Sequence, residues 1–216
     1  MDYQEHKKHF NAAYKTGTDA WTHPYTDRES LKLTEKLSPN AYILDIGSGR
    51  GFLAKHLAEM GFKVIGIDFD GDIVNKANGD IMDWKLEGRV KFVEADALSI
   101  PFPDASFDAA CDFGLFETLY KNDWEKYASE VNRVLKPGGF YFNVSLSAET
   151  GHFFEFSPKG STEKDFEKYG IHYHFFEKAE MKSVFSGKLE TISQGTSLAT
   201  KNDGVVLLET LFQKNK

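Results

Sequence analysis

The chain has 216 residues, which predicts one domain under a prior of about 150 residues per domain. Hydrophobic residues make up 41% of the sequence and charged residues 27%, both ordinary for a globular protein. The 26 basic and 33 acidic side chains give a formal net charge of −7, which argues against a general nucleic-acid or membrane-surface binder, because phosphate contact needs a basic footprint.

Seven short apolar runs, each followed by turn residues, predict strands. Apolar residues recur at helical spacing between the early runs, most clearly at Trp124–Lys136, and Pro137–Gly139 is interpreted as a turn. Strand–helix–strand units with runs apolar on both faces predict a parallel sheet covered by helices on each side. The predicted strands are Tyr42–Ile46, Val64–Ile67, Val90–Val93, Phe107–Phe113, Phe140–Leu146, Leu189–Ile192 and Val205–Phe212.

The last two runs have only turn residues between them, so they predict an antiparallel hairpin appended to the parallel sheet. We expect one domain over residues 1–216, with a helix and loop cap at residues 1–40. Residues 148–176 are rich in aromatic rings and lack clear periodicity, which favours a lid that covers a bound small molecule. The alternative is that these rings pack onto the sheet as core. The rings are Phe153, Phe154, Phe156, Phe166, Tyr169, Tyr173 and Phe175.

A glycine-rich turn follows the first predicted strand and has the pattern D-x-G-x-G-x-G at Asp45–Gly51. Glycines allow backbone to approach a ligand closely, and ligands of open α/β sheets bind beyond the carboxyl ends of the strands. A dinucleotide fingerprint requires G-x-G-x-x-G, but the sixth position counted from Gly47 is Phe52. No Gly-Lys-Ser/Thr follows the turn, so a P-loop is not indicated either.

Acidic residues end the next two strands. Asp68 is placed to accept hydrogen bonds from a ribose diol, and Asp96 to accept from an exocyclic adenine amine, while Phe69 can cover one face of the base. Each acid taken singly has the alternative role of a helix N-cap. Acids at three successive strand ends beside a glycine turn favour a nucleoside site.

These motifs resemble the ordered motifs of class I S-adenosylmethionine-dependent methyltransferases over residues 40–147. The resemblance implies a Rossmann-like, mostly parallel seven-stranded sheet, with which the terminal strand pair agrees. The segment Phe10–Lys15 through Trp21 is similar to one that precedes the core in small-molecule members of the thiopurine and tellurite-resistance type. The matching motifs are Asp45–Gly51, Asp68, Glu94–Ala97, Pro101–Phe102, Ser106–Asp108 and Arg133–Gly139.

The resemblance implies S-adenosylmethionine as cofactor and methyl transfer to a small molecule. It places Asp45 near the cofactor's amino group, Asp68 at the ribose, Asp96 at the adenine amine and backbone of Phe113 at the methionyl amine. The other residues implied for cofactor binding are Gly47, Gly49, Gly51, Phe69 and Ala97.

Methyl transfer needs a general base only where the acceptor loses a proton as it attacks. Candidate bases are Tyr14, Glu117, His152 and His172, each with a structural role as the alternative. No metal is expected, because neither His6 with His9 nor His172 with His174 has a convincing third ligand.

Residues 112–117 lack the Asn/Asp-Pro-Pro-Tyr type sequence of nucleic-acid N-methyltransferases, so we expect no nucleic-acid acceptor. Two other functions stay open: a NAD-dependent oxidoreductase and a non-catalytic cofactor-binding module with the same fold. The single cysteine, Cys111, fits a reducing compartment, and no apolar run approaches the roughly 20 residues that span a bilayer. We therefore expect a cytoplasmic protein without membrane contact.

Overall fold

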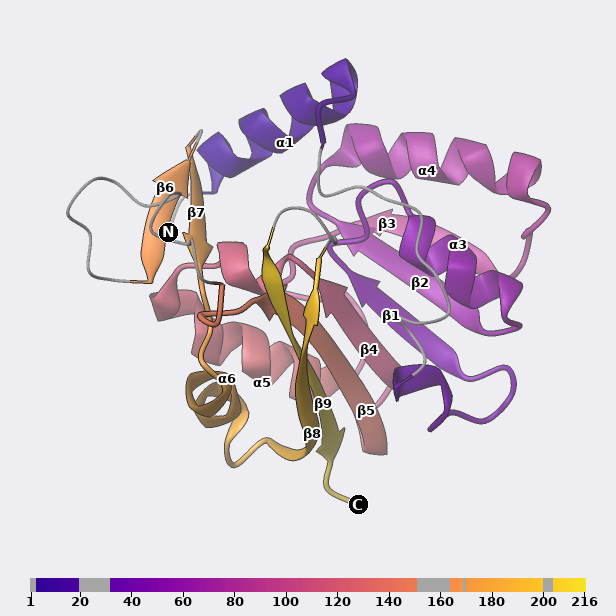
Figure 1. Ribbon diagram of the computed structural model, residues 1–216. Coiled ribbons are helices and arrows are strands. Elements are labelled where there is room, and N and C mark those ends of the chain that lie inside the picture. Colours follow the sequence, from indigo (N-terminus) through magenta and orange to yellow (C-terminus); the bar gives the residue numbers. More distant parts are fainter. Residues whose placement is uncertain (1–2, 20–31, 151–163, 169, 200–203) are drawn as a thin grey trace.

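A seven-stranded sheet runs through the middle of the protein (Figure 1). Its strands are β1 (Tyr42–Ile46), β2 (Lys63–Asp68), β3 (Val90–Glu94), β4 (Phe107–Phe113), β5 (Leu135–Leu146), β8 (Leu189–Leu198) and β9 (Val206–Lys214). The computed structural model describes residues 3–19, 32–150, 164–168, 170–199 and 204–216. The strand order is β3-β2-β1-β4-β5-β9-β8, with β1 to β5 parallel and β9 antiparallel to both β5 and β8. This confirms the predicted sheet and its C-terminal antiparallel pair.

Helices cover both faces of the sheet (Figure 1). Those on the faces are α3 (Phe52–Glu59), α4 (Gly71–Trp84), α5 (Trp124–Val134) and α6 (Lys178–Phe185), while α1 (Gln4–Thr16) lies at the carboxyl ends of the strands. One core lies between the sheet and α5 with α6, and the other between the sheet and α3 with α4. Ile43 and Leu44 of β1 are fully buried in different cores, which explains why the run is apolar on both sides. In the described part of the chain, no helix combines the length and apolar character that a bilayer crossing requires.

The connections between strands create a crevice at the carboxyl ends of the two central strands, β1 and β4. From β1 the chain moves to β2 and β3 on one side, then returns to β4 and β5 on the other. Strand order therefore reverses between β1 and β4, where Ile46, the last residue of β1, lies opposite Asp112, the residue before the last of β4. Ligands of open α/β sheets bind beyond the carboxyl ends of the strands at such a reversal.

The junction between α5 and β5 differs from the prediction. The helix predicted at Trp124–Lys136 ends at Val134, and Leu135 opens β5 with φ −73° and ψ 138°. Pro137 disfavours helical backbone at Lys136, so the helix does not reach its predicted end. Pro137–Gly139, predicted as a turn, instead lies within β5 as an irregularity where the register against β4 shifts.

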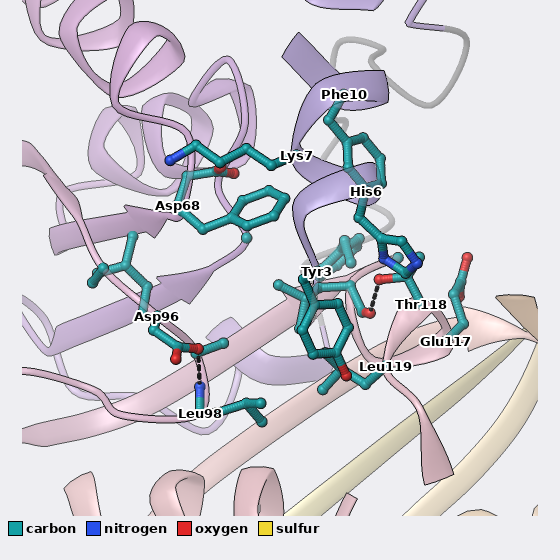
Figure 2. Close-up of a pocket in the computed structure, with 18 of the residues that line it drawn as sticks. Tyr3, His6, Lys7, Phe10, Asp68, Asp96, Leu98, Glu117, Thr118 and Leu119 are labelled. Atoms are coloured by element: carbon teal, nitrogen blue, oxygen red, sulfur yellow. Dashed lines mark hydrogen bonds between the residues drawn. The ribbon is translucent and has the colours of Figure 1, made fainter. Parts of the chain in front are cut away.

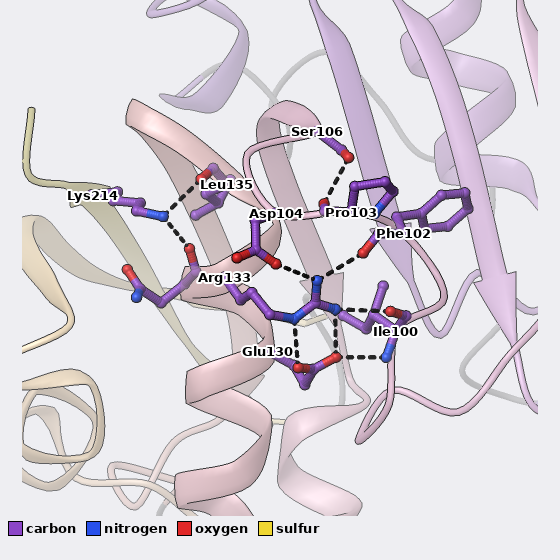
Figure 3. A network of polar contacts seen from close by, with 10 residues as sticks. Ile100, Phe102, Pro103, Asp104, Ser106, Glu130, Arg133, Leu135 and Lys214 are labelled. Atoms are coloured by element: carbon purple, nitrogen blue, oxygen red, sulfur yellow. Dashed lines mark hydrogen bonds and ion pairs between the residues drawn. The ribbon is translucent and has the colours of Figure 1, made fainter.

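Arg133, near the end of α5, holds the loop that follows β3 (Figure 3). Its guanidinium donates to the carbonyls of Ile100 at 2.8 Å and Phe102 at 2.7 Å, and pairs with Glu130 and Asp104. Glu130 also accepts the backbone N–H of Ile100 at 2.7 Å. The loop held in this way carries residues 96–98, which line the cavity described below.

A second, two-stranded sheet forms where no regular element was predicted: β6 (Asp165–Lys168) and β7 (Ile171–His174). His174 is buried, with its ring nitrogens 2.8 Å from Asp165 and 2.9 Å from Glu180, and Phe176 is fully buried in the core. Much of the described part of residues 148–176 therefore packs as core. His152, Phe153, Phe154, Phe156 and Tyr169 lie outside the described residues.

Candidate functional site

A cavity of about 470 Å³ lies at the carboxyl ends of β1 to β4. Its size is within the usual range for small-molecule sites. Residues that follow these four strands line it, together with α1 and Tyr173 of β7. Figure 2 shows Asp68 and Asp96 on one side of the cavity and Glu117 with Thr118 on the other. The cavity therefore has two ends with separate acids.

The three glycines of the turn after β1 do different things. All have left-handed backbone, with φ of +75° at Gly47, +50° at Gly49 and +78° at Gly51. Gly47 lines the cavity. A Cβ on Gly49 would lie 2.7 Å from the hydroxyl of Tyr14, and one on Gly51 would lie 2.7 Å from a ring carbon of Phe92. Gly49 thus makes room for α1, while Gly51 allows the start of α3 to pack on β3.

Asp68, at the end of β2, joins the turn to the cavity. Its Oδ2 accepts the N–H of Gly49 at 2.9 Å, and its Oδ1 accepts that of Asp70 at 3.0 Å. Burial raises the pKa of this carboxyl to about 6, although these two N–H donors act in the opposite direction. A carboxylate offers about four acceptor positions, so Asp68, which lines the cavity, keeps acceptor capacity for a ligand.

An apolar slot with an acid beside it lies next to Asp68. Phe69, Ala97 and Leu98 line the cavity, and so does Asp96. The carboxylate of Asp96 accepts the N–H of Leu98 at 2.8 Å, which fixes its orientation (Figure 2). Such a slot suits a flat ring with a hydrogen-bond donor at its edge.

Asp45 does not line the cavity, unlike the other two acids at strand ends. It is 2% exposed, and its Oδ2 has no hydrogen-bond partner. Burial raises its pKa to about 8, and the charges of Asp112 and Asp68 add to the rise. A buried carboxyl oxygen without a partner is unusual and calls for a functional or structural explanation.

Two of the four candidate bases line the cavity, Tyr14 and Glu117. His172 does not: it is buried, stacks on the ring of Tyr120, and its backbone N–H donates to His6. Among the described residues no group of three or more His, Cys, Asp or Glu side chains is placed to hold a metal ion. Phe113, expected from the sequence, also lines the cavity.

The face of α1 that closes the cavity was missed by the sequence analysis apart from Tyr14. Tyr3, His6, Lys7 and Phe10 line the cavity with it. These positions recur at helical spacing and share one face of the helix, which is a signal that the sequence does contain. The signal does not say what that face covers.

Specific contacts hold α1 in place. Arg50 of the glycine turn donates two hydrogen bonds to Asp19, at 2.6 and 2.8 Å, and one to the carbonyl of Tyr14 at 2.9 Å. Asn11 donates to Asp70, which caps α4. The turn therefore fixes the cap that covers the cavity.

Known proteins resemble this chain mainly over its first five strands. Residues 43–139 match a family described as a methyltransferase domain. A demethylmenaquinone methyltransferase of Thermus thermophilus is 40% identical over 114 residues, covering 52% of this chain and 50% of the relative. A sterol 4-C-methyltransferase of Caenorhabditis elegans is 34% identical over 111 residues, covering 51% of this chain and 33% of the relative. The chain thus spans half or less of the length of these relatives.

A solved structure extends the likeness to the whole fold. It is the 1,6-didemethyltoxoflavin-N1-methyltransferase of Burkholderia thailandensis, with bound 1,6-didemethyltoxoflavin and S-adenosylhomocysteine. It has a TM-score of 0.79 and 20% identity, covering 99% of this chain and 88% of that chain. At this identity the likeness shows a shared fold.

Proposed function

We propose that this chain, whose residues 43–139 match a family described as a methyltransferase domain, transfers a methyl group from S-adenosylmethionine to a small organic acceptor. The observation that carries the proposal is the acid-lined cavity at the strand-order reversal, closed by α1. We further propose that residues 1–216 act as one domain in which residues 1–40 form the cap.

The residues at the cavity fit this cofactor, which combines an adenosine, an amino acid tail and a sulfonium but has no phosphate. Asp68 lines the cavity and keeps acceptor capacity for the ribose diol. Asp96 beside Phe69 and Ala97 suits the adenine ring and its amine. Asp45 does not line the cavity, so its unpartnered Oδ2 would reach the ammonium group of the tail through water. We propose that Gly47 and the backbone of Phe113 complete this end of the site.

The turn itself is poorly suited to a dinucleotide. A pyrophosphate is normally held by free N–H groups of the glycine turn and the helix that follows. Here Gly47 and Ser48 both donate to the carbonyl of Ile67, and Gly49 donates to Asp68. Because these donors are already used, a pyrophosphate-binding site at this turn is disfavoured, and so is a NAD-dependent oxidoreductase.

Bound S-adenosylmethionine supplies an electrophilic methyl carbon, so the protein's contribution is positioning. Holding two reactants in line provides effective molarities of about 10⁵–10⁸ M. The walls formed by α1 and by the residues after β4 hold the acceptor and exclude water from it. We propose a small acceptor with a ring, as the names of the quinone, sterol and toxoflavin enzymes suggest, and no nucleic acid.

A cytoplasmic location is part of the same proposal. Cys111 is a free and fully buried thiol, and burial raises its pKa. A free buried cysteine is typical of proteins kept in a reducing compartment.

Thermal unfolding with S-adenosylhomocysteine, S-adenosylmethionine and NAD in parallel tests the cofactor. At 100 times its dissociation constant a ligand stabilises by about 2.7 kcal/mol, which raises the midpoint of a chain of this size by roughly 5–10 °C. We expect this shift with the two adenosyl ligands and none with NAD. A shift with NAD alone would overturn the cofactor assignment. Binding without turnover on any acceptor class would favour the non-catalytic module.

Asp68→Ala is expected to weaken S-adenosylhomocysteine binding by about 1.5–3 kcal/mol, the range for hydrogen bonds to a charged group. Calorimetric titration measures this loss, and Asp83→Ala, an exposed acid on α4, is the control that should bind normally. Affinity of the wild type should also fall as the pH falls through about 6, because protonation of Asp68 removes acceptor positions. An unchanged dissociation constant in Asp68→Ala would sink the ribose assignment.

A further inference from the structure

Three acids line the cavity, and Glu117 lies at the end away from Asp68 and Asp96 (Figure 2). We infer that Glu117 is the catalytic base of this site and that the methyl acceptor is a neutral aromatic ring carrying an O–H or N–H group. This inference rests on the methyl transfer proposed above. It adds a residue role and a chemical class of acceptor to that function.

The position of Glu117 leaves one carboxylate oxygen for a ligand. The residue lies in the 3₁₀ helix η1 (Phe116–Thr118) after β4 and is 8% exposed. Its Oε2 accepts the backbone N–H of Leu146 at 2.7 Å, which holds the carboxyl in place. The other oxygen, Oε1, lies near Gly114, which also lines the cavity: a Cβ placed on Gly114 would be 3.7 Å from Oε1. No ion pair to Glu117 is found in the described part of the chain, so its charge is not already neutralised by a cation.

The groups around Glu117 leave it as the group that titrates at this end of the cavity, so it becomes a proton acceptor as the pH rises through about 8. Burial raises the pKa of Glu117 to about 8, and the hydrogen bond from the N–H of Leu146 lowers it. The charge of Asp112 in β4 raises the pKa further. Asp112 itself has a pKa of about 6, raised by burial, so it is already ionised. On α1, burial lowers the pKa of His6 to about 4, and on β7 it raises that of Tyr173 to about 12, so both are neutral. A base performs best when its pKa is near the working pH.

The remaining lining favours a neutral aromatic acceptor. Tyr3, Phe10 and Tyr173 bring rings to the cavity, and Leu119 adds an aliphatic side chain. Among the described lining residues Lys7 is the permanent cation, but its ammonium lies 3.6 Å from Glu94 and 6.0 Å from the centre of the Phe69 ring. An anionic acceptor beside Glu117 would thus meet a like charge without compensation, which is costly in a buried site.

The proposed step is balanced by the cofactor and the acceptor. A lone pair of the ring's oxygen or nitrogen forms a bond to the methyl carbon, and the carbon–sulfur bond breaks with its electron pair going to sulfur. The O–H or N–H proton moves to Oε1 of Glu117 and is later lost to solvent. The products are the methylated ring and S-adenosylhomocysteine.

Binding of phenol to protein saturated with S-adenosylhomocysteine tests the inference. Phenol stays neutral between pH 6.5 and 9 (its pKa resembles the ~10 of tyrosine), so Glu117 is the partner that changes. Phenol affinity should rise about tenfold over this range in the wild type, because a hydrogen bond to an ionised carboxylate is stronger than one to a neutral carboxyl. Anisole, which lacks the O–H, should show no rise.

Glu117→Gln is the decisive variant, because an amide oxygen still accepts the N–H of Leu146 but does not ionise. It should bind S-adenosylhomocysteine as the wild type does, and its phenol affinity should not depend on pH. Glu87→Gln, at an exposed acid, is the matched control and should keep the wild-type slope. Asp45 also has a pKa of about 8, raised by burial, but it is unchanged in Glu117→Gln, so a slope that persists there overturns the role of Glu117.

Turnover with labelled S-adenosylmethionine and phenol completes the test. The wild type should form anisole, and Glu117→Gln should do so about a hundredfold more slowly, the lower range of general-base effects. Equal rates, or no anisole from the wild type, overturn the inference. Failure of S-adenosylhomocysteine to bind the wild type would instead remove the proposed function, so the two failures are distinguishable.

Discussion

Gly51→Ala is expected to lower the free energy of unfolding by about 2–5 kcal/mol. Left-handed backbone costs an alanine about 1–2 kcal/mol, and Gly51 has φ of +78°. The new Cβ would also lie 2.7 Å from Cε1 of Phe92 and closer still to Cζ, and overpacking of a core costs about 1–3 kcal/mol. Denaturant unfolding of the unliganded protein measures the sum.

Gly61→Ala separates the two contributions. Gly61 also has positive φ, +100°, but a Cβ there meets nothing within 4 Å, so this variant carries the backbone strain alone. Adding Phe92→Leu to Gly51→Ala should recover part of the excess loss, since a smaller side chain relieves the contact. Equal losses in Gly51→Ala and Gly61→Ala would contradict the packing of α3 on β3 described above.

Asp45→Asn is expected to stabilise the unliganded protein, by on the order of 5 kcal/mol at pH 8, since each unit of pKa shift corresponds to about 1.4 kcal/mol. Burial raises the pKa of Asp45 to about 8 in the folded protein, against 3.8 ordinarily. Between these values the folded state holds a proton that the unfolded state has lost. The wild type therefore loses stability as the pH rises from about 4 to 8, and the asparagine variant lacks that contribution.

Unfolding in denaturant at pH 4, 6 and 8 follows this difference. The two proteins should be similar at pH 4 and should diverge with rising pH, reaching a constant gap above pH 8. Because Asp45 is also proposed to meet the cofactor's ammonium group, S-adenosylhomocysteine should stabilise the variant less than it stabilises the wild type. A gap that does not depend on pH would show that Asp45 is not protonated in the folded protein.

Several features of the site follow from residues that are neighbours in the chain. The apolar runs of β1 and β4, the glycine turn at Asp45–Gly51 and the acid that ends β2 are all local patterns. Alternation in the strands, helical spacing and the backbone freedom of glycine act over a few residues, so one chain is enough to recognise them. The reversal of strand order then brings the carboxyl ends of these strands together.

Local sequence patterns predicted the secondary structure less well where a residue fits two elements or where an element depends on tertiary contacts. The end of α5 was placed two residues too late, because the helical spacing that includes Leu135 continues into a residue that β5 uses as its first extended position. The strands β6 (Asp165–Lys168) and β7 (Ile171–His174) were not predicted, because they form where β7 packs against α1 and η1. Propensity alone does not decide such elements, because tertiary contacts override it.

By itself the sequence determined the fold class, the turn and the positions of Asp68 and Asp96, since periodicity and chain order are properties of adjacent residues. Only the tertiary structure decided that Tyr3 and Phe10 close the cavity, that Asp45 lies outside it, and that Glu117 faces it as a buried acid. Burial, and with it the free energy of ionising a carboxyl, depends on residues far apart in the chain. For that reason the sequence alone does not distinguish the environments of the acids Asp45, Asp68 and Glu117.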